Sequence, residues 1–421
     1  MNLFIDIIIL CAFLAEVILL MHIEKRLWGT LFTPLNALSL PFTAILLITL
    51  CLPSSLGFVP FYFPSLLIWA GGLALMAIPS WLLGYGFRKR YGTAEPVVEP
   101  PKKELLFLLA TLVLIMPFGL RLREMMANSL DLLGSDEFGE NFAEFGVFGH
   151  LLHFLFACSV LCFACVRKER RLLPIAVIVL IAALAFINQV KSWVFIPIIA
   201  GFWMCLAGKK MKLSLRFLLS LVIGGLVLFV GSYLAIFILG NGLEYNEHMA
   251  EYIGEHIMHY LTSGVLGLSE DLRRGILEAQ DPNVLFAPFV NLIHFFTGDA
   301  YVNVVNPYFI EISTNNSLAD NVRTYFGTIY IYSPVPVYCL IVVLLGFFFY
   351  LIRIAALRAQ SVYISAIDGW FCALLVMGWF EYYLFHLTSF EVPLYLLLMF
   401  IIEKTLIPRK TTYGNDSYSQ L

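Results

Sequence analysis

The chain has 421 residues, of which 60% are hydrophobic and only 13% are charged, and its formal net charge is −3 at pH 7. Soluble globular domains carry about 25% charged residues, so the composition excludes an ordinary soluble enzyme. It predicts an all-α, polytopic membrane protein, in which each crossing needs roughly 20 mostly apolar residues.

The apolar residues gather into runs that predict about 11 transmembrane helices, of which the sixth and seventh are short for a full crossing. The chain then divides into spans one to eight (1–239), a large outer loop (240–331), spans nine to eleven (332–404) and a polar tail (405–421). In chain order, the expected spans cover Leu3–Met21, Leu35–Leu52, Phe63–Tyr85, Glu104–Leu120, Val147–Val166, Leu172–Asn188, Ser192–Ala207, Phe217–Leu239, Tyr332–Ile352, Val362–Phe385 and Thr388–Glu403.

Every second loop between these runs is basic, and these loops with the tail hold 20 of the 26 Lys and Arg residues. Cytoplasmic loops retain Lys and Arg, so the pattern predicts an outer N-terminus and a cytoplasmic C-terminus. The six cations left for the outer side are the first candidates for chemistry. They are Arg121, Arg123, Lys191, Arg273, Arg274 and Arg323.

The eight cysteines all fall inside the apolar runs. A disulfide framework would place them in outer loops, so we interpret them as small residues of the packed helices. Cys158, Cys162 and Cys165 lie at helical spacing, but they have no polar partner nearby in the sequence, which favours packing over metal binding.

A tight outer turn between the sixth and seventh runs, residues 188–192, carries Lys191 as its one cation. A lysine on the outer side runs against the positive-inside bias. Two interpretations stay open. The side chain either extends along the membrane interface with its ammonium group in water, or it faces an anion in the outer leaflet.

The large outer loop is too apolar and aromatic to be disordered, so we expect it to fold against the membrane surface. Residues Asn246–Leu268 predict an amphipathic helix, because apolar residues recur at four-residue steps along one stripe. A second helical stretch, Glu270–Ala279, carries Arg273 and Arg274. Pro282 and Pro288 then break the helical pattern, and the stretch Asn303–Tyr325, rich in Asn and small polar residues, leads back to the membrane.

Signatures of soluble enzymes are missing from the sequence, including phosphate-binding loops, zinc helices and nucleophile elbows. The pair His256 and His259, beside Glu255, could bind a metal, but no third ligand follows from the sequence, and we expect no metal. The same three residues could supply a general base for a sugar hydroxyl. Arg273, Arg274, Arg323 and Lys191 could bind a phosphate or pyrophosphate, although Arg273 and Arg274 could equally form surface ion pairs with neighbouring acids.

Polar residues inside the spans are few and therefore informative. Most lie at the outer ends of spans, which favours a site at the outer interface over a path through the membrane. The outer group is His150, His153, Glu381, His386 and Glu391, whereas Asp368 lies near an inner end.

The segment Asn316–Phe326, followed at once by a hydrophobic run, resembles the point where the large periplasmic loop re-enters the membrane in Wzy-type polymerases of O-antigen or capsule repeat units. These proteins have ten to fourteen spans, one dominant periplasmic loop and an N-V-x-T-x-F stretch at the re-entry point. The matching residues are Asn321, Val322, Thr324 and Phe326. Lys191 stands where the wider group often has an arginine.

The resemblance implies a glycosyltransferase of the bacterial inner membrane that needs no cofactor, metal or nucleic acid. It would transfer the growing glycan from undecaprenyl pyrophosphate to the non-reducing end of an incoming undecaprenyl-pyrophosphate-linked repeat unit, with a chain-length co-polymerase as a further partner. The implied catalytic residues are Glu255, His256 and His259. The implied residues for pyrophosphate or glycan are Arg323, Lys191, Arg273, Arg274, Asn321 and Thr324.

Three alternatives stay open. An O-antigen ligase uses the same donor, but it would have a histidine near the end of the loop, where this chain has only His294 further upstream. A polysaccharide or lipid transporter would need a polar path through the membrane. A membrane acyltransferase would need a central histidine in a re-entrant segment.

Overall fold

The computed structural model describes residues 3–51, 57–91, 95–128, 142, 146–188, 191–241, 249–275, 281–306, 308–314 and 319–406. Within these residues it contains fourteen α-helices and one two-stranded sheet, which confirms the all-α prediction. The predicted polar tail after Leu406 lies outside the described residues.

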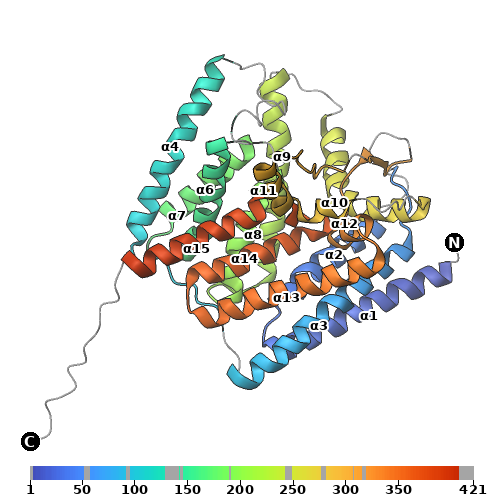
Figure 1. Cartoon of the computed structure of the whole chain (residues 1–421). Helices are drawn as coiled ribbons and strands as arrows, with labels where there is room; N and C mark the ends of the chain where they lie inside the picture. The colour runs from blue at the N-terminus through green and yellow to red at the C-terminus, as the bar shows by residue number, and fades with distance from the viewer. Residues whose placement is uncertain are drawn as a thin grey trace, which may run out of the picture.

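The first part of the chain forms eight helices (Figure 1). They are α1 (Leu3–Trp28), α2 (Pro34–Cys51), α3 (Leu66–Tyr91), α4 (Glu104–Asn128), α6 (Gly146–Cys165), α7 (Leu172–Ile187), α8 (Lys191–Ala207) and α9 (Leu215–Asn241). A short 3₁₀ turn, η2 (Phe63–Ser65), precedes α3.

The outer loop and the last part of the chain supply the other elements. They are α10 (Met249–Arg274), η5 (Pro282–Phe286), α11 (Ala287–Thr297), β1 (Ile310–Glu311), β2 (Ala319–Asp320), α12 (Tyr325–Tyr332), α13 (Val335–Ala359), α14 (Val362–Val376), η6 (Met377–Trp379), η7 (Tyr383–Phe385) and α15 (Thr388–Leu406).

Each of the eleven predicted spans overlaps one of these helices, but the tenth, predicted to run to Phe385, is α-helical only to Val376 and then continues into η6 and η7. Among the described residues, seven helices are long and apolar enough to cross a membrane, so the chain is that of a membrane-embedded protein. The seven are α1, α2, α3, α4, α6, α13 and α14. The remaining predicted spans are α7, α8, α9 and α15; the first two are short, with 16 and 17 residues, as the sequence suggested.

Helix α14 lies at the centre of the bundle and packs against α8, α13, α15 and α2. Its Trp370 is fully buried and stacks on Trp193 of α8, with 6.2 Å between the ring centroids. Peripheral helices instead present large apolar side chains outward, such as Leu82 of α3, as a lipid-facing surface requires.

The outer-loop elements cover one end of the bundle. In Figure 1, α10 and α12 lie near the end where α1 begins, and α15 finishes at the opposite end. Strands β1 and β2 pair antiparallel with Ile310 opposite Asp320, and Phe58 forms a bridge with Ser313. The loop is therefore tied to the connection between α2 and α3.

Helix α10 differs from its prediction in two ways. The two expected helical stretches are one continuous helix. Only its first half has the expected exposed face, because every residue from Thr262 to Asp271 is buried. Helix α10 packs against α2, η2 and both strands of the sheet, so its second half is part of the protein core.

Candidate functional site

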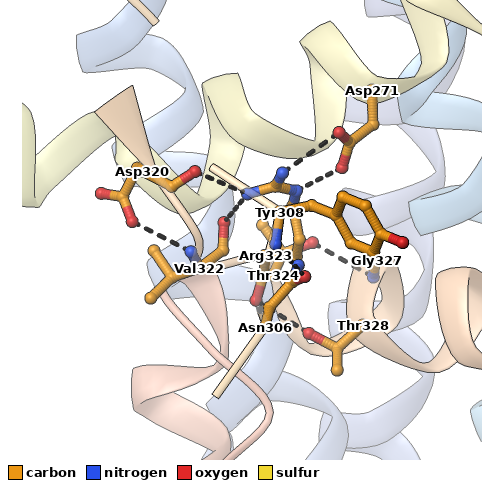
Figure 2. A network of polar contacts seen from close by, with 9 residues as sticks. All are labelled: Asp271, Asn306, Tyr308, Asp320, Val322, Arg323, Thr324, Gly327 and Thr328. Atoms are coloured by element: carbon orange, nitrogen blue, oxygen red, sulfur yellow. Dashed lines mark hydrogen bonds and ion pairs between the residues drawn. The ribbon is translucent and has the colours of Figure 1, made fainter. Parts of the chain in front are cut away.

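Arg323 lies at the centre of a buried network that joins the re-entry segment to α10 (Figure 2). Its Nε donates to Oδ2 of Asp271 and its Nη2 donates to Oδ1 at 3.1 Å. Its Nη1 donates to the carbonyls of Asp320 and Val322, at 3.2 and 2.8 Å. The Arg323 side chain is only 2% exposed, so most of its donors are committed to protein acceptors. Its assignment to pyrophosphate binding stays a prediction.

The Arg323–Asp271 pair is held in an environment that disfavours charge. Burial raises the pKa of Asp271, while the hydrogen bonds and charge of Arg323 act in the opposite direction. An ionised carboxylate at this position therefore depends on its arginine. The pair fixes the re-entry segment to the end of α10.

The other residues of the motif build the turn by which the loop enters α12. Thr324 caps this helix, because its Oγ1 accepts from the backbone N–H of Gly327 at 3.2 Å, and it also accepts from Nε1 of Trp69 at 3.0 Å. Phe326 is fully buried and packs edge-on against Trp69. Asn321 donates from Nδ2 to a loop carbonyl at 3.1 Å. Asn321 and Thr324 thus have structural roles, and their contact with glycan stays a prediction.

His259 of α10 forms an imidazole–carboxylate pair with the re-entry segment. Its Nε2 lies 2.8 Å from Oδ2 of Asp320, and the two side chains are 16% and 12% exposed. In the neutral ring a proton on Nε2 leaves Nδ1 as the acceptor, which is the arrangement that a general base needs. His256 is half-buried with its ring 6.3 Å away, and Glu255 is exposed.

Arg273 and Arg274 share one buried carboxylate at the end of α10. Nε and Nη2 of Arg273 and Nε of Arg274 donate to Glu270 at 2.6–2.7 Å. Burial alone would raise the pKa of Glu270, but the hydrogen bonds and charges of both arginines outweigh it and hold that pKa below its usual value. The hydrogen bond to Glu270 raises the pKa of Arg273 in return.

Arg273 and Arg274 therefore form the ion pairs that the sequence suggests as an alternative to phosphate binding. The carboxylate and the two arginines differ, however, in how exposed they are. Glu270 is 1% exposed, whereas the Arg273 and Arg274 side chains are 42% and 39% exposed. The carboxylate orients two half-exposed guanidinium groups, and Nη2 of Arg274 also lies 3.8 Å from Oε2 of Glu311. Such a pair suits an oxyanion.

The candidate residues on α10 form two separate groups. His259 and Arg273 are 14 residues apart on one helix, which is about 20 Å of helix rise. One small ligand cannot contact both, so the structure separates the proposed base from the arginine pair.

Lys191 is the first residue of α8, and its side chain lies outside the described part of the structure. Two residues later, the Trp193 ring packs against His386, with 5.6 Å between centroids. His386 belongs to the connector between α14 and α15, residues 377–387. The same connector meets α10, where Tyr260 stacks on Phe380 with 6.1 Å between centroids. The start of α8 and the His259 region therefore adjoin one connector.

Sequence reasoning missed the partners of these residues. Asp271 and Asp320 could not be matched to Arg323 and His259, because 52 and 61 residues separate them. The same holds for His150, His153 and Glu391. These residues from α6 and α15 meet at 2.7 Å although more than 230 residues separate them.

The opposite end of the bundle holds charged residues of a different kind. Arg353, which the sequence assigns to a basic loop, is in fact 1% exposed and donates from Nη1 to Asp368 at 2.6 Å. Glu24 is also buried and accepts from Tyr350 at 2.7 Å. A pocket of about 460 Å³ at this end is lined by Glu104 and by residues 168–174. It contains none of the candidate residues.

Comparison with known proteins gives one match. Residues 57–408 match a family described as a family of unknown function (DUF6337). No curated protein and no solved structure is significantly similar to the chain.

Proposed function

The chain belongs to the DUF6337 family, whose description assigns no activity, and we propose that it polymerises lipid-linked oligosaccharide repeat units. It transfers the growing glycan from undecaprenyl pyrophosphate to the non-reducing end of an incoming undecaprenyl-pyrophosphate-linked unit. The observation that carries this proposal is the arrangement on α10, where a His–carboxylate pair and an exposed arginine pair are held far apart. The resemblance of the re-entry motif supports the same reaction.

The proposed topology follows from the sorting of basic residues. Helices α7, α8, α9 and α15 cross the bacterial inner membrane together with the seven long apolar helices, which makes eleven crossings. The N-terminus is periplasmic and the C-terminus cytoplasmic. The loop of residues 240–331 then faces the periplasm, where lipid-linked glycans are assembled.

His259 acts as the general base in this reaction. Its Nδ1 takes the proton of the acceptor hydroxyl while that oxygen bonds to the anomeric carbon of the donor glycan. The bond from this carbon to the pyrophosphate oxygen breaks, and undecaprenyl pyrophosphate leaves with the electron pair. Asp320, 2.8 Å from Nε2, stabilises the imidazolium that forms.

A polymerase has to hold two lipid-linked substrates, and this requirement explains the separation on α10. The acceptor hydroxyl and the acceptor's own pyrophosphate lie at opposite ends of an oligosaccharide. With the hydroxyl at His259, Arg273 and Arg274 hold the distant pyrophosphate, about 20 Å away along the helix. Lys191 meets the donor pyrophosphate beside the connector. Arg323 is a positioning residue in this scheme.

The remaining candidate residues on α10 and in the re-entry segment have less direct roles. Glu255 and His256 lie within one turn of His259 and contact the acceptor sugar. Asn321 and Thr324 shape the re-entry turn beside it. A chain-length co-polymerase is the partner expected of such an enzyme.

A transporter without catalysis is the second candidate, because one observation favours it. The ion pair between Arg353 and Asp368 and the buried Glu24 lie inside the helix bundle near its other end, and buried ionisable residues in membrane proteins often mark transport paths. Such a protein would move the same lipid across the membrane and would form no glycosidic bond.

The test is an in vitro polymerisation with purified protein in detergent. The substrate is a lipid-linked repeat unit from the source strain, without nucleotide sugar, and products are separated on a gel. We expect a ladder spaced by one repeat unit. His259→Ala should lower kcat on the order of 100-fold or more, because it removes the general base. Arg273→Ala/Arg274→Ala should mainly raise KM for the acceptor.

His294→Ala is the matched control, because this loop histidine lies on α11 rather than α10 and its Nδ1 is 2.7 Å from the carbonyl oxygen of Ala300. It should keep the wild-type ladder. If the wild type gives no ladder but moves the same lipid across proteoliposome membranes, the protein is a transporter and the polymerase proposal is wrong.

A further inference from the structure

Two histidines of α6 and one glutamate of α15 converge near the first turns of both helices. We infer that His150, His153 and Glu391 bind one divalent transition-metal ion of the Zn²⁺ class. The site is distinct from the residues on α10 and does not rest on the proposed function. It also departs from the metal-free chemistry that the resemblance implies.

The three ligand atoms already face one another. Nδ1 of His150 lies 2.7 Å from Oε1 of Glu391, and Nδ1 of His153 lies 2.7 Å from Oε2. All three possible ligand atoms lie within 4.8 Å of one another. Ligands of tetrahedral zinc stand about 3.4 Å apart, given bonds of about 2.1 Å. An ion therefore needs the imidazoles to move by less than about 1 Å.

The sequence spacing favours this convergence. His150 and His153 are three residues apart on α6, so both side chains leave the same face of the helix. Glu391 projects from the first turn of α15, which packs against α6. One ion would therefore hold together two helices that are distant in sequence.

Two of the three ligands have outer partners that fix their orientation. Nε2 of His153 lies 2.9 Å from Oγ1 of Thr388, so its Nδ1 points at the centre of the site. Tyr395 donates from its hydroxyl to Oε1 of Glu391 at 2.6 Å. Metal-binding imidazoles and carboxylates usually have such second partners.

The donor set selects the type of ion. Two imidazole nitrogens and one carboxylate suit Zn²⁺, Co²⁺ or Ni²⁺, whereas Mg²⁺ and Ca²⁺ prefer oxygen ligands alone. Glu391 is 10% exposed while His150 is 57% exposed. The ion would thus be reached from solvent past His150, with a coordination position left for water.

A hydrogen-bonded clamp without metal is the competing explanation of the same contacts. In that case both Nδ1 atoms carry protons and donate to Glu391. The two explanations make different predictions for added metal, because a hydrogen-bonded clamp does not bind an ion.

Cobalt provides the direct test, because Co²⁺ bound by nitrogen and oxygen ligands absorbs visible light. The full chain carries a purification tag without histidine, is stripped with chelator in detergent, and is titrated with Co²⁺. We expect the absorption to saturate at one equivalent per chain and to disappear when Zn²⁺ is added. His150→Ala and Glu391→Gln should abolish the signal. Thr388→Val should weaken binding on the order of tenfold, as loss of an outer partner does.

His294→Ala again serves as the control and should bind Co²⁺ like the wild type. Of the ligand variants, His150→Ala should disturb folding least, because the His150 side chain is 57% exposed. If the wild type develops no cobalt absorption, or if His150→Ala develops the same absorption, the metal site does not exist. The three residues then form only a hydrogen-bonded clamp.

Discussion

At Arg323 the structure predicts a folding defect before any effect on substrate, because removing this side chain leaves the Asp271 carboxylate buried without a counter-charge. Breaking one partner of a buried ion pair costs about 3–5 kcal/mol. Arg323→Ala should therefore lower the midpoint of thermal unfolding of the protein in detergent. Arg323→Met/Asp271→Leu should recover much of the loss, since neither charge remains. If the single variant melts like the wild type, the pair does not hold the loop.

The defect of Arg323→Ala should also depend on pH. Burial raises the pKa of Asp271, and this effect is larger once Arg323 is gone. A carboxyl group whose pKa is higher in the folded than in the unfolded protein stabilises the fold in acid. This contribution is lost as the pH rises from the unfolded pKa, about 3.9, through the higher folded pKa. The gap in melting midpoint between variant and wild type should thus narrow from neutral pH toward acid. Melting curves at several pH values test this, and a gap that widens in acid contradicts it.

At the scale of elements, α10 depends on two glycines that let it approach other backbone closely. A Cβ added to Gly264 would lie 2.4 Å from the carbonyl oxygen of Phe380, and one added to Gly267 would lie 2.8 Å from that of Val322. Gly264→Ala should therefore push α10 away from the connector and cost about 1–3 kcal/mol. Gly254→Ala is the control on the same helix, because nothing lies within 4 Å of its added Cβ. Its effect should be neutral or stabilising by up to about 1 kcal/mol, because alanine favours helix. Equal melting midpoints for the two variants would show that this close approach is unimportant.

The same helix shows where a sequence pattern stops being informative. The periodic apolar residues of α10 predict a helix correctly, because local spacing determines that outcome. They could not predict that residues 262–271 are buried on all sides. The charged residues there, Glu270 and Asp271, are paired with arginines, and one of these arginines is 52 residues away in the sequence. Burial of a charged residue depends on such a distant partner, and no local spacing encodes it.

For the whole molecule, the sequence is most informative where the bilayer acts on each segment separately. Every predicted apolar run contains a helix because a chain in lipid has to satisfy its backbone hydrogen bonds within each segment. Clusters of side chains from segments far apart in the sequence were not predictable. His150, His153 and Glu391 were recognised singly as polar residues at span ends, and only the packing of α15 on α6 brings them together.

The sorting of charge between the two ends of the bundle makes one prediction about the molecule as a whole. The end with α10 should face the periplasm, because the loops at the other end hold most of the Lys and Arg residues. Alkaline phosphatase folds only in the periplasm. Inserted after Asp299, in an exposed stretch that follows α11, it should be active. The same insertion after Lys168, in a basic loop, should be inactive, and green fluorescent protein fused to the C-terminus should fluoresce because it stays in the cytoplasm. The reverse pattern at these three positions would mean that the protein has the opposite orientation in the membrane. The residues on α10 would then face the cytoplasm, out of reach of periplasmic lipid-linked glycans, and the polymerase proposal would fail together with the orientation.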